Sequence, residues 1–125
     1  KMNQELGKKG YYNVEQLFIS NNQFKDYQGQ VLDLVRTGND ESTMGPIVRI
    51  TNNSFINLQS NAVDKPMIRF AGVQKTLLEN NRFINCYTSK VMILYQDEVK
   101  AAHRLKGNQS EGSGQIQTNK FLVIE

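Results

Sequence analysis

Ile50-Thr51-Asn52-Asn53-Ser54-Phe55-Ile56-Asn57 is the stretch of this 125-residue sequence that decides the fold, because it recurs along the chain. Residues 19–26 and 78–85 read the same way: aliphatic, any residue, Asn, Asn, any residue, Phe, any residue, then Asp or Asn. Residues 105–110 form a fainter fourth copy that has lost the Phe. The second Asn stands at positions 22, 53, 81 and 108, so the intervals are 31, 28 and 27 residues. A repeat of this length with strand-like content is typical of a solenoid.

Alternating apolar residues precede the Asn pairs. Val48 and Ile50 are expected to face the interior and Arg49 the solvent, a period of two that indicates a strand with one buried face. A second strand follows each copy after a turn, at residues 31–35, 67–71 and 91–95, and the last copy is expected to supply residues 115–118 or 121–124. The 3.6-residue pattern of helical repeats is missing. The sequence therefore predicts an all-β, right-handed parallel β-helix of about four coils, stacked ~4.8 Å apart.

Equivalent residues of neighbouring coils are expected to lie above one another, so identical side chains stack. Stacked Asn side chains hydrogen-bond along the stack as a ladder, and stacked Phe rings fill the interior. Asn also tolerates the left-handed backbone conformation that a tight bend requires. The predicted structural ladder consists of Asn22, Asn53, Asn81, Asn108, Phe24, Phe55 and Phe83. Cys86 falls where earlier copies have Tyr27 and Leu58, so it is expected to pack in the core as a small hydrophobe.

Length and composition limit the classes of protein that remain. A chain of 125 residues fits one domain, 1–125, and its single cysteine excludes a disulfide scaffold and a Cys-rich zinc site. Fifteen Lys and Arg against twelve Asp and Glu give a net charge of +3 without a basic block, which argues against a nucleic-acid partner. No apolar run reaches the roughly 18 residues that a membrane span needs. Both ends lack the polar caps of a free-standing solenoid, so we expect a module of a longer β-helical protein.

Polar loops interrupt the repeat, and solenoids carry function on such insertions. The loop at residues 37–46 contains Asp40 and Glu41, which are either solvated or, with loop carbonyls, ligands for Ca²⁺; we prefer the solvated interpretation and assign no metal site. A second loop spans residues 59–65. A third, at residues 107–114, is rich in Gly and Ser and is expected to be flexible. His103 shares a core-facing position with Leu17 and Val48 and is expected to be buried or stacked at the edge of the core rather than to act as a base.

Outward-facing cations are the remaining candidates for a site. Arg49 and Arg104 occupy the same strand position in different copies, and Arg36 lies at a strand end. Arg suits planar, bidentate recognition of sugar carboxylates or sulfates, although a solvated β-helix face is the simpler interpretation. The candidate substrate-binding residues are Arg36, Arg49, Arg104, Asp40 and Glu41. No residue is assigned a catalytic role.

Residues 32–46, Leu-Asp-Leu-Val-Arg-Thr-Gly-Asn-Asp-Glu-Ser-Thr-Met-Gly-Pro, add a more specific feature to the repeat. With the repeat, over residues 12 to about 110, they resemble the C-terminal β-helical part of alginate lyases in the alginate lyase/chondroitinase B family of polysaccharide lyases. The most specific element is the Asn-Asp-Glu-Ser-Thr-x-Gly-Pro loop at residues 39–46.

The resemblance implies β-elimination on a uronic acid in a parent enzyme, with a Lys as base, an Arg as acid and calcium on the sugar carboxylate. No copy of that catalytic motif or of its calcium ligands is recognisable in this sequence, so the catalytic centre is expected in an upstream β-helix domain. The chain would then be an accessory module without a cofactor of its own. The resemblance further implies an anionic polysaccharide partner, alginate or a related uronate polymer, and a secreted or periplasmic location.

Two other classes of function remain open. One is an active glycan lyase or hydrolase site within these coils, which requires converging titratable groups on one face. The other is a purely structural β-helix, such as a surface adhesin or a phage fibre, with no affinity for soluble uronates.

Overall fold

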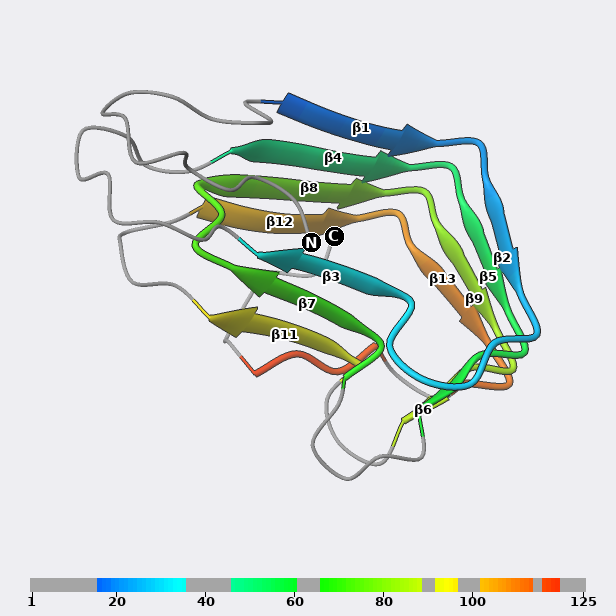
Figure 1. Ribbon diagram of the computed structural model, residues 1–125. Helices are drawn as coiled ribbons and strands as arrows, with labels where there is room; N and C mark the ends of the chain where they lie inside the picture. Colours follow the sequence, from blue (N-terminus) through cyan, green and yellow to red (C-terminus); the bar gives the residue numbers. More distant parts are fainter. Residues whose placement is uncertain are drawn as a thin grey trace.

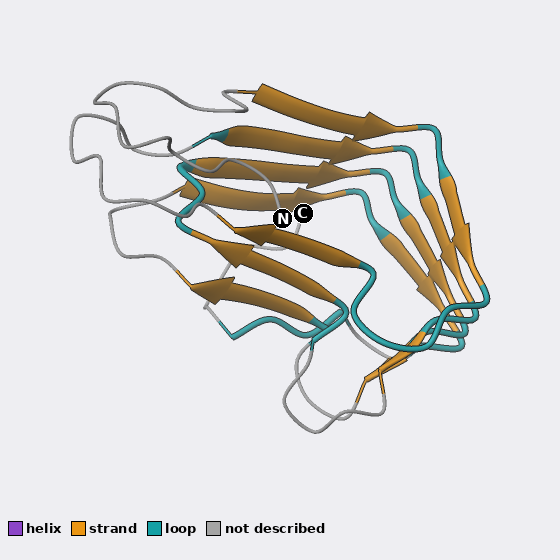
Figure 2. Cartoon of the chain, in the orientation of Figure 1, coloured by secondary structure: helices purple, strands orange, loops and turns teal. Residues whose placement is uncertain are grey.

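The computed structural model describes residues 16–35, 46–60, 66–88, 92–96, 102–113 and 116–119. These residues form β-strands joined by turns and contain no helix, so the all-β class is confirmed (Figure 2). Within the same residues there is accordingly no helix long and apolar enough to cross a membrane.

All strand pairs in the described part of the chain are parallel, and they build three sheets and a short corner pair (Figure 1). Sheet I contains, in order, β1 (Gln16–Ser20), β4 (Ile47–Thr51), β8 (Lys75–Glu79) and β12 (Ala102–Lys106). Sheet II contains β2 (Gln23–Lys25), β5 (Ser54–Ile56), β9 (Arg82–Ile84) and β13 (Gln109–Glu111). Sheet III contains β3 (Leu32–Val35), β7 (Ile68–Ala71) and β11 (Ile93–Gln96), and the corner pair is β6 (Gln59–Ser60) with β10 (Tyr87–Thr88).

The chain visits these sheets in the same order each time. We call the strands from one member of sheet I up to the next a rung, so that β1, β4, β8 and β12 each begin a rung. Stacked rungs of parallel strands are the arrangement expected of a parallel β-helix.

The sequence repeat sets the register between rungs. In sheet I, Ile50 pairs with both Ile19 and Leu78, and in sheet II Phe55 pairs with both Phe24 and Phe83. The copies of the repeat therefore lie directly on top of one another. The second strands predicted at residues 31–35, 67–71 and 91–95 are confirmed as β3, β7 and β11.

Two predictions from the sequence concern the fourth rung: its strand beside β11 and its flexible loop. Thr118 forms a bridge with Ile93, so the segment predicted at 115–118 supplies a partner of β11, while Gln115 and the alternative at 121–124 lie outside the described residues. The flexible loop expected at residues 107–114 is wrong for residues 109–111, which form β13. Parallel pairing with β9 uses backbone groups, which Gly and Ser retain, so composition alone misjudged this segment.

Each rung bends twice through residues with positive φ. At the first bend, between sheets I and II, the first Asn of each pair has a φ of 58°, 57° or 56° in Asn21, Asn52 and Asn80. Gly107, with a φ of 67°, takes this place in the fourth rung. The second bend follows sheet II at Asp26, Asn57, Asn85 and Gly112, all with positive φ. Asn, Asp and Gly are the residues that enter this region most readily, which explains the repeated letters at both ends of the motif.

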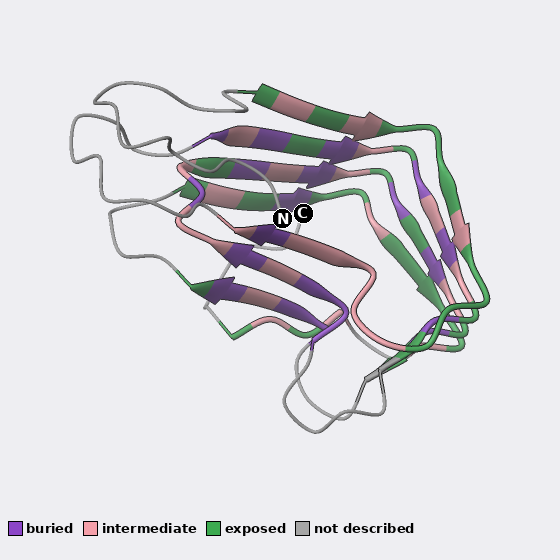
Figure 3. Ribbon diagram, in the orientation of Figure 1, coloured by how far each residue is buried: buried purple, intermediate pink, exposed green. Residues whose placement is uncertain are grey.

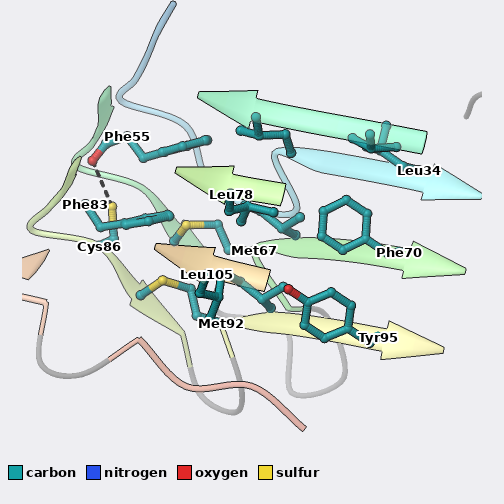
Figure 4. Close-up of a cluster of buried hydrophobic side chains, with 14 of the residues drawn as sticks. Leu34, Phe55, Met67, Phe70, Leu78, Phe83, Cys86, Met92, Tyr95 and Leu105 are labelled. Atoms are coloured by element: carbon teal, nitrogen blue, oxygen red, sulfur yellow. Dashed lines mark hydrogen bonds between the residues drawn. The ribbon is translucent and has the colours of Figure 1, made fainter. Parts of the chain in front are cut away.

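Most of the buried residues belong to the two middle rungs, and Leu34 of the first rung and Leu105 of the fourth complete the core (Figure 3). Phe55 lies between Phe24 and Phe83, with centroid distances of 5.0 and 4.8 Å and nearly parallel rings. Phe55 and Phe83 are fully buried, whereas Phe24 at the end of this column is half-buried. Cys86 packs beside them and is 1% exposed, so the core position predicted for it is confirmed (Figure 4).

Candidate functional site

The second Asn of each pair joins the rungs through its side chain. Asn81 donates from Nδ2 to Oδ1 of Asn108 at 2.9 Å and to the carbonyl of Ile50 at 2.8 Å, and its backbone N–H donates to the same Oδ1 at 2.9 Å. Asn53 donates in the same way to Oδ1 of Asn81, and Asn22 to Oδ1 of Asn53. These amides hold neighbouring rungs together at the first bend. Because these amides are engaged with one another, ligand-binding groups are expected elsewhere on the molecule.

The outer face of sheet I carries a surplus of positive charge. Alternate residues of its strands point outward, and four cations against one carboxylate lie there among the described residues: Arg49, Lys75, Arg104 and Lys106 against Glu79. Among the described residues, positive charge is thus concentrated on this face. A cationic face of this kind attracts polyanions.

Phe18, Arg49, Leu77 and Arg104 form the central column of this face, because the strand register places each directly beside the next. Phe18 is 60% exposed, and the guanidinium of Arg49 lies 5.9 Å from the centroid of its ring, within range of a cation–π contact. Arg104 is exposed at the other end of the column. An exposed ring beside guanidinium groups offers stacking to a sugar ring and charge-assisted hydrogen bonds to a carboxylate.

On the other two sheets, two outward arginines are paired with carboxylates of neighbouring rungs. On sheet III, Arg69 binds Asp33 through two hydrogen bonds, from Nε at 2.8 Å and from Nη2 at 3.2 Å. On sheet II, Nη2 of Arg82 lies 3.0 Å from Oε1 of Glu111. Both pairs are substantially exposed, so each stabilises the fold by at most about 1 kcal/mol. Counted by residue type among the described residues, the outer face of sheet I carries the largest surplus of positive side chains.

The predicted site residues fall into two groups. The structure brings Arg49 and Arg104 into one column, two rungs apart. Arg36, Asp40 and Glu41 lie outside the described residues, so their part in a site stays a prediction. Among the described residues no group of three or more His, Cys, Asp or Glu side chains gathers to hold a metal ion.

His103 belongs to the interior and not to this face. It occupies the inward column of Val48 and Thr76, with Nδ1 2.8 Å from Oγ1 of Thr76. Its ring packs 4.1 Å from the ring centroid of Tyr95. These contacts make His103 part of the packing between sheets I and III.

Cys86 is an inert thiol. Burial raises the pKa of its thiol above the usual value of 9.0, and hydrogen bonds with neighbouring groups only partly oppose this effect. The thiol donates to the carbonyl of Phe55 at 3.1 Å, and the backbone N–H of Cys86 donates to Oγ of Ser113 at 2.7 Å. A protonated, buried thiol is a poor nucleophile.

Reasoning from the sequence found the two arginines of the face but missed Lys75 and Lys106. The missed lysines were recognisable, because Lys75 stands two residues before Leu77 and Lys106 two residues after Arg104. A period of two places each on the same side of its strand as the central column.

No protein-family model, curated protein or solved structure matches the chain at a significant level. The likeness to alginate lyases therefore stays an expectation from the sequence, and the geometry of the face is the basis for assigning a function.

Proposed function

We propose that this chain is an accessory module of a polysaccharide lyase. It binds an anionic uronate polysaccharide, alginate or a related polymer. The observation that carries the proposal is the outer face of sheet I, where four cations oppose one carboxylate beside the exposed ring of Phe18. Arginine and lysine bind carboxylates, while an exposed aromatic ring packs against the apolar face of a pyranose. Both features lie on one four-stranded sheet, which suits an extended polymer.

We propose further that the fold consists of four coils of a right-handed parallel β-helix. Connections between parallel strands of one sheet are right-handed in about 98% of cases, which supports the hand. The asparagine ladder, with one member in each rung, supports four coils. Such a module uses its sheets as a rigid support for side chains on the outer face.

The accessory role rests on the resemblance to alginate lyases. In that arrangement an upstream β-helix domain performs the β-elimination with its own Lys, Arg and Ca²⁺. This module then needs no cofactor and contributes no catalytic residue. A secreted or periplasmic location follows from the same resemblance, because uronate polymers are extracellular. Arg36, Asp40 and Glu41 would extend the binding surface from the loop that carries the resemblance.

The first test is a calorimetric titration of the chain with a hexasaccharide of mannuronate. Arg49→Gln is expected to weaken binding about tenfold, the value of one charge-assisted contact. Lys25→Gln is the matched control, because it removes the same charge from the exposed outer face of sheet II. It is expected to weaken binding less than about twofold, because Lys25 lies on a different sheet from the proposed contacts and salt screens exposed charges.

A lyase assay that follows unsaturated uronate by its ultraviolet absorbance is run alongside. Product formed by the chain alone would contradict the accessory role and indicate an active site within these coils. The absence of binding to any uronate polymer would reject the proposal in favour of a structural or adhesin β-helix.

A further inference from the structure

We infer that the central column of sheet I binds an acidic polysaccharide with one sugar over each rung. The two arginines of the column then bind the carboxylates of alternate sugars. This inference rests on the proposed function. It adds the path of the polymer, which runs across the strands, and the spacing of the carboxylates that are recognised. Its basis is the order of side chains in the column: aromatic, cationic, aliphatic, cationic, in Phe18, Arg49, Leu77 and Arg104.

The spacing of the two arginines follows from the stacking of the strands. Neighbouring strands of a sheet lie about 4.8 Å apart, so Arg49 and Arg104, with one strand between them, are about 10 Å apart at the backbone. A 1,4-linked pyranose advances its chain by about the same distance as one inter-strand step. A polysaccharide that lies across the strands therefore presents one sugar to each rung, and the two guanidinium groups meet sugars i and i+2.

The residue between the arginines supports this alternation. Leu77 is the half-buried side chain of the column at the third rung and offers no charge to the intervening sugar. It offers an apolar contact to the face of that ring, as Phe18 does at the first rung. The column thus alternates between apolar side chains that pack against the faces of sugar rings and guanidinium groups that bind carboxylates.

The direction of the polymer also follows from the charges. Lys75 and Lys106 stand on opposite sides of the central column, each exposed on the same face. A polymer that follows the column remains between these two lysines, whereas one that ran along a single strand would meet at most two of the four cations. Charge complementarity therefore favours the path across the strands.

The inference is tested with oligosaccharides that differ in charge spacing and in length. The probes are tetrasaccharides of mannuronate, which carry a carboxylate on every sugar, tetrasaccharides of alternating glucuronate and N-acetylglucosamine, which carry one on every second sugar, and the disaccharides of both. We expect the two tetrasaccharides to bind within about threefold of each other, and each to bind at least tenfold more tightly than its disaccharide.

Arg49→Gln, Arg104→Gln and the double variant complete the experiment. With a tetrasaccharide each single substitution is expected to reduce affinity about tenfold, because each removes one carboxylate contact. With a disaccharide, which cannot reach both groups, the second substitution should add little to the first. Leu77→Glu keeps both arginines and is expected to weaken the tetrasaccharides by at least tenfold through repulsion. All three side chains point outward, so unchanged circular dichroism spectra are expected for the variants.

The outcomes separate the inference from the proposed function. Two outcomes would overturn the inference and leave the proposed function intact. One is that uronates bind without a step in affinity between disaccharide and tetrasaccharide. The other is a preference of tenfold or more for the tetrasaccharide with a carboxylate on every sugar. Equal affinity for oligothymidylate, whose phosphates are more closely spaced, would also overturn it and indicate a nonspecific polyanion site. Failure of all the uronates to bind would reject the proposed function itself.

Discussion

Asn81 is the side chain whose removal most directly tests how the rungs are held together. Its carboxamide takes part in four hydrogen bonds: Nδ2 donates to Asn108 and to the carbonyl of Ile50, and Oδ1 accepts from the backbone N–H and the Nδ2 of Asn53. Asn81 is fully buried, so water does not compete for these groups. Asn81→Ala removes all four bonds and leaves the N–H of Asn53 without this acceptor.

The expected loss of stability is about 4 kcal/mol. A hydrogen bond within a protein contributes about 1 kcal/mol net, and a buried donor that loses its acceptor costs about 1–3 kcal/mol. Asn22→Ala is the matched control, since Asn22 is exposed and its Nδ2 makes two hydrogen bonds, to Asn53 and to the carbonyl of Ser20. We expect this control to lose about 1 kcal/mol. A domain of this length has a total stability of about 6–19 kcal/mol, so the difference between the variants is large enough to measure.

Urea unfolding followed by far-ultraviolet circular dichroism is the appropriate assay. The two variants and the parent chain should share one m value, so that differences in midpoint report stability alone. If Asn81→Ala lost no more free energy than Asn22→Ala, the ladder would contribute nothing beyond local turn contacts, and the reasoning would be refuted.

Three further predictions address the ring column, the first bend and the thiol. Phe55→Ala is expected to cost about 3–5 kcal/mol in urea unfolding, because a fully buried ring is lost from between two others, and Phe24→Ala, at the half-buried end, should cost less than half as much; equal costs would contradict the packing. Gly107→Ala is expected to cost about 1–2 kcal/mol, since it forces a side chain into positive φ and its Cβ would collide with Oδ1 of Asn80; an unchanged melting temperature would contradict this. Because the pKa of Cys86 is raised in the folded state, its contribution to stability is complete below the usual value of 9.0 and is lost as pH rises through the folded pKa. The urea midpoint of the parent chain should therefore fall more steeply with pH above 9.0 than the midpoint of Cys86→Ala. Identical pH slopes for the two proteins would exclude the effect.

The sequence was informative about the fold because a repeat constrains the same position several times. Asn53, Phe55 and their counterparts recur at a fixed place in each copy, and parallel pairing turns this recurrence into stacked columns. The short strands of sheet II were not foreseen, since three residues after an Asn pair carry too little alternation to be recognised as a strand. Their existence depends on the neighbouring rungs, which supply the backbone partners.

The face of sheet I was only half predictable for a related reason. Arg49 and Arg104 are 55 positions apart in the numbering of the chain, and the repeat alone places them in one column. The sequence could not indicate that Arg69 and Arg82 are paired with carboxylates, because Asp33 and Glu111 belong to other rungs. Which cations remain as a surplus on a face is therefore a property of the folded structure.

The two asparagines of each pair have different physical tasks, which explains why the fourth copy of the repeat is faint. The first must adopt positive φ, and Gly107 does so as well as Asn80 does. The second must supply a carboxamide to the ladder, which glycine cannot do, and here the fourth copy keeps Asn108. The Phe position is free to change to Ser110 because that side chain is exposed in the described structure, whereas Phe83 beside it is fully buried. A search for further rungs of this kind should therefore require the ladder Asn, accept Asn or Gly before it, and give the Phe the least weight.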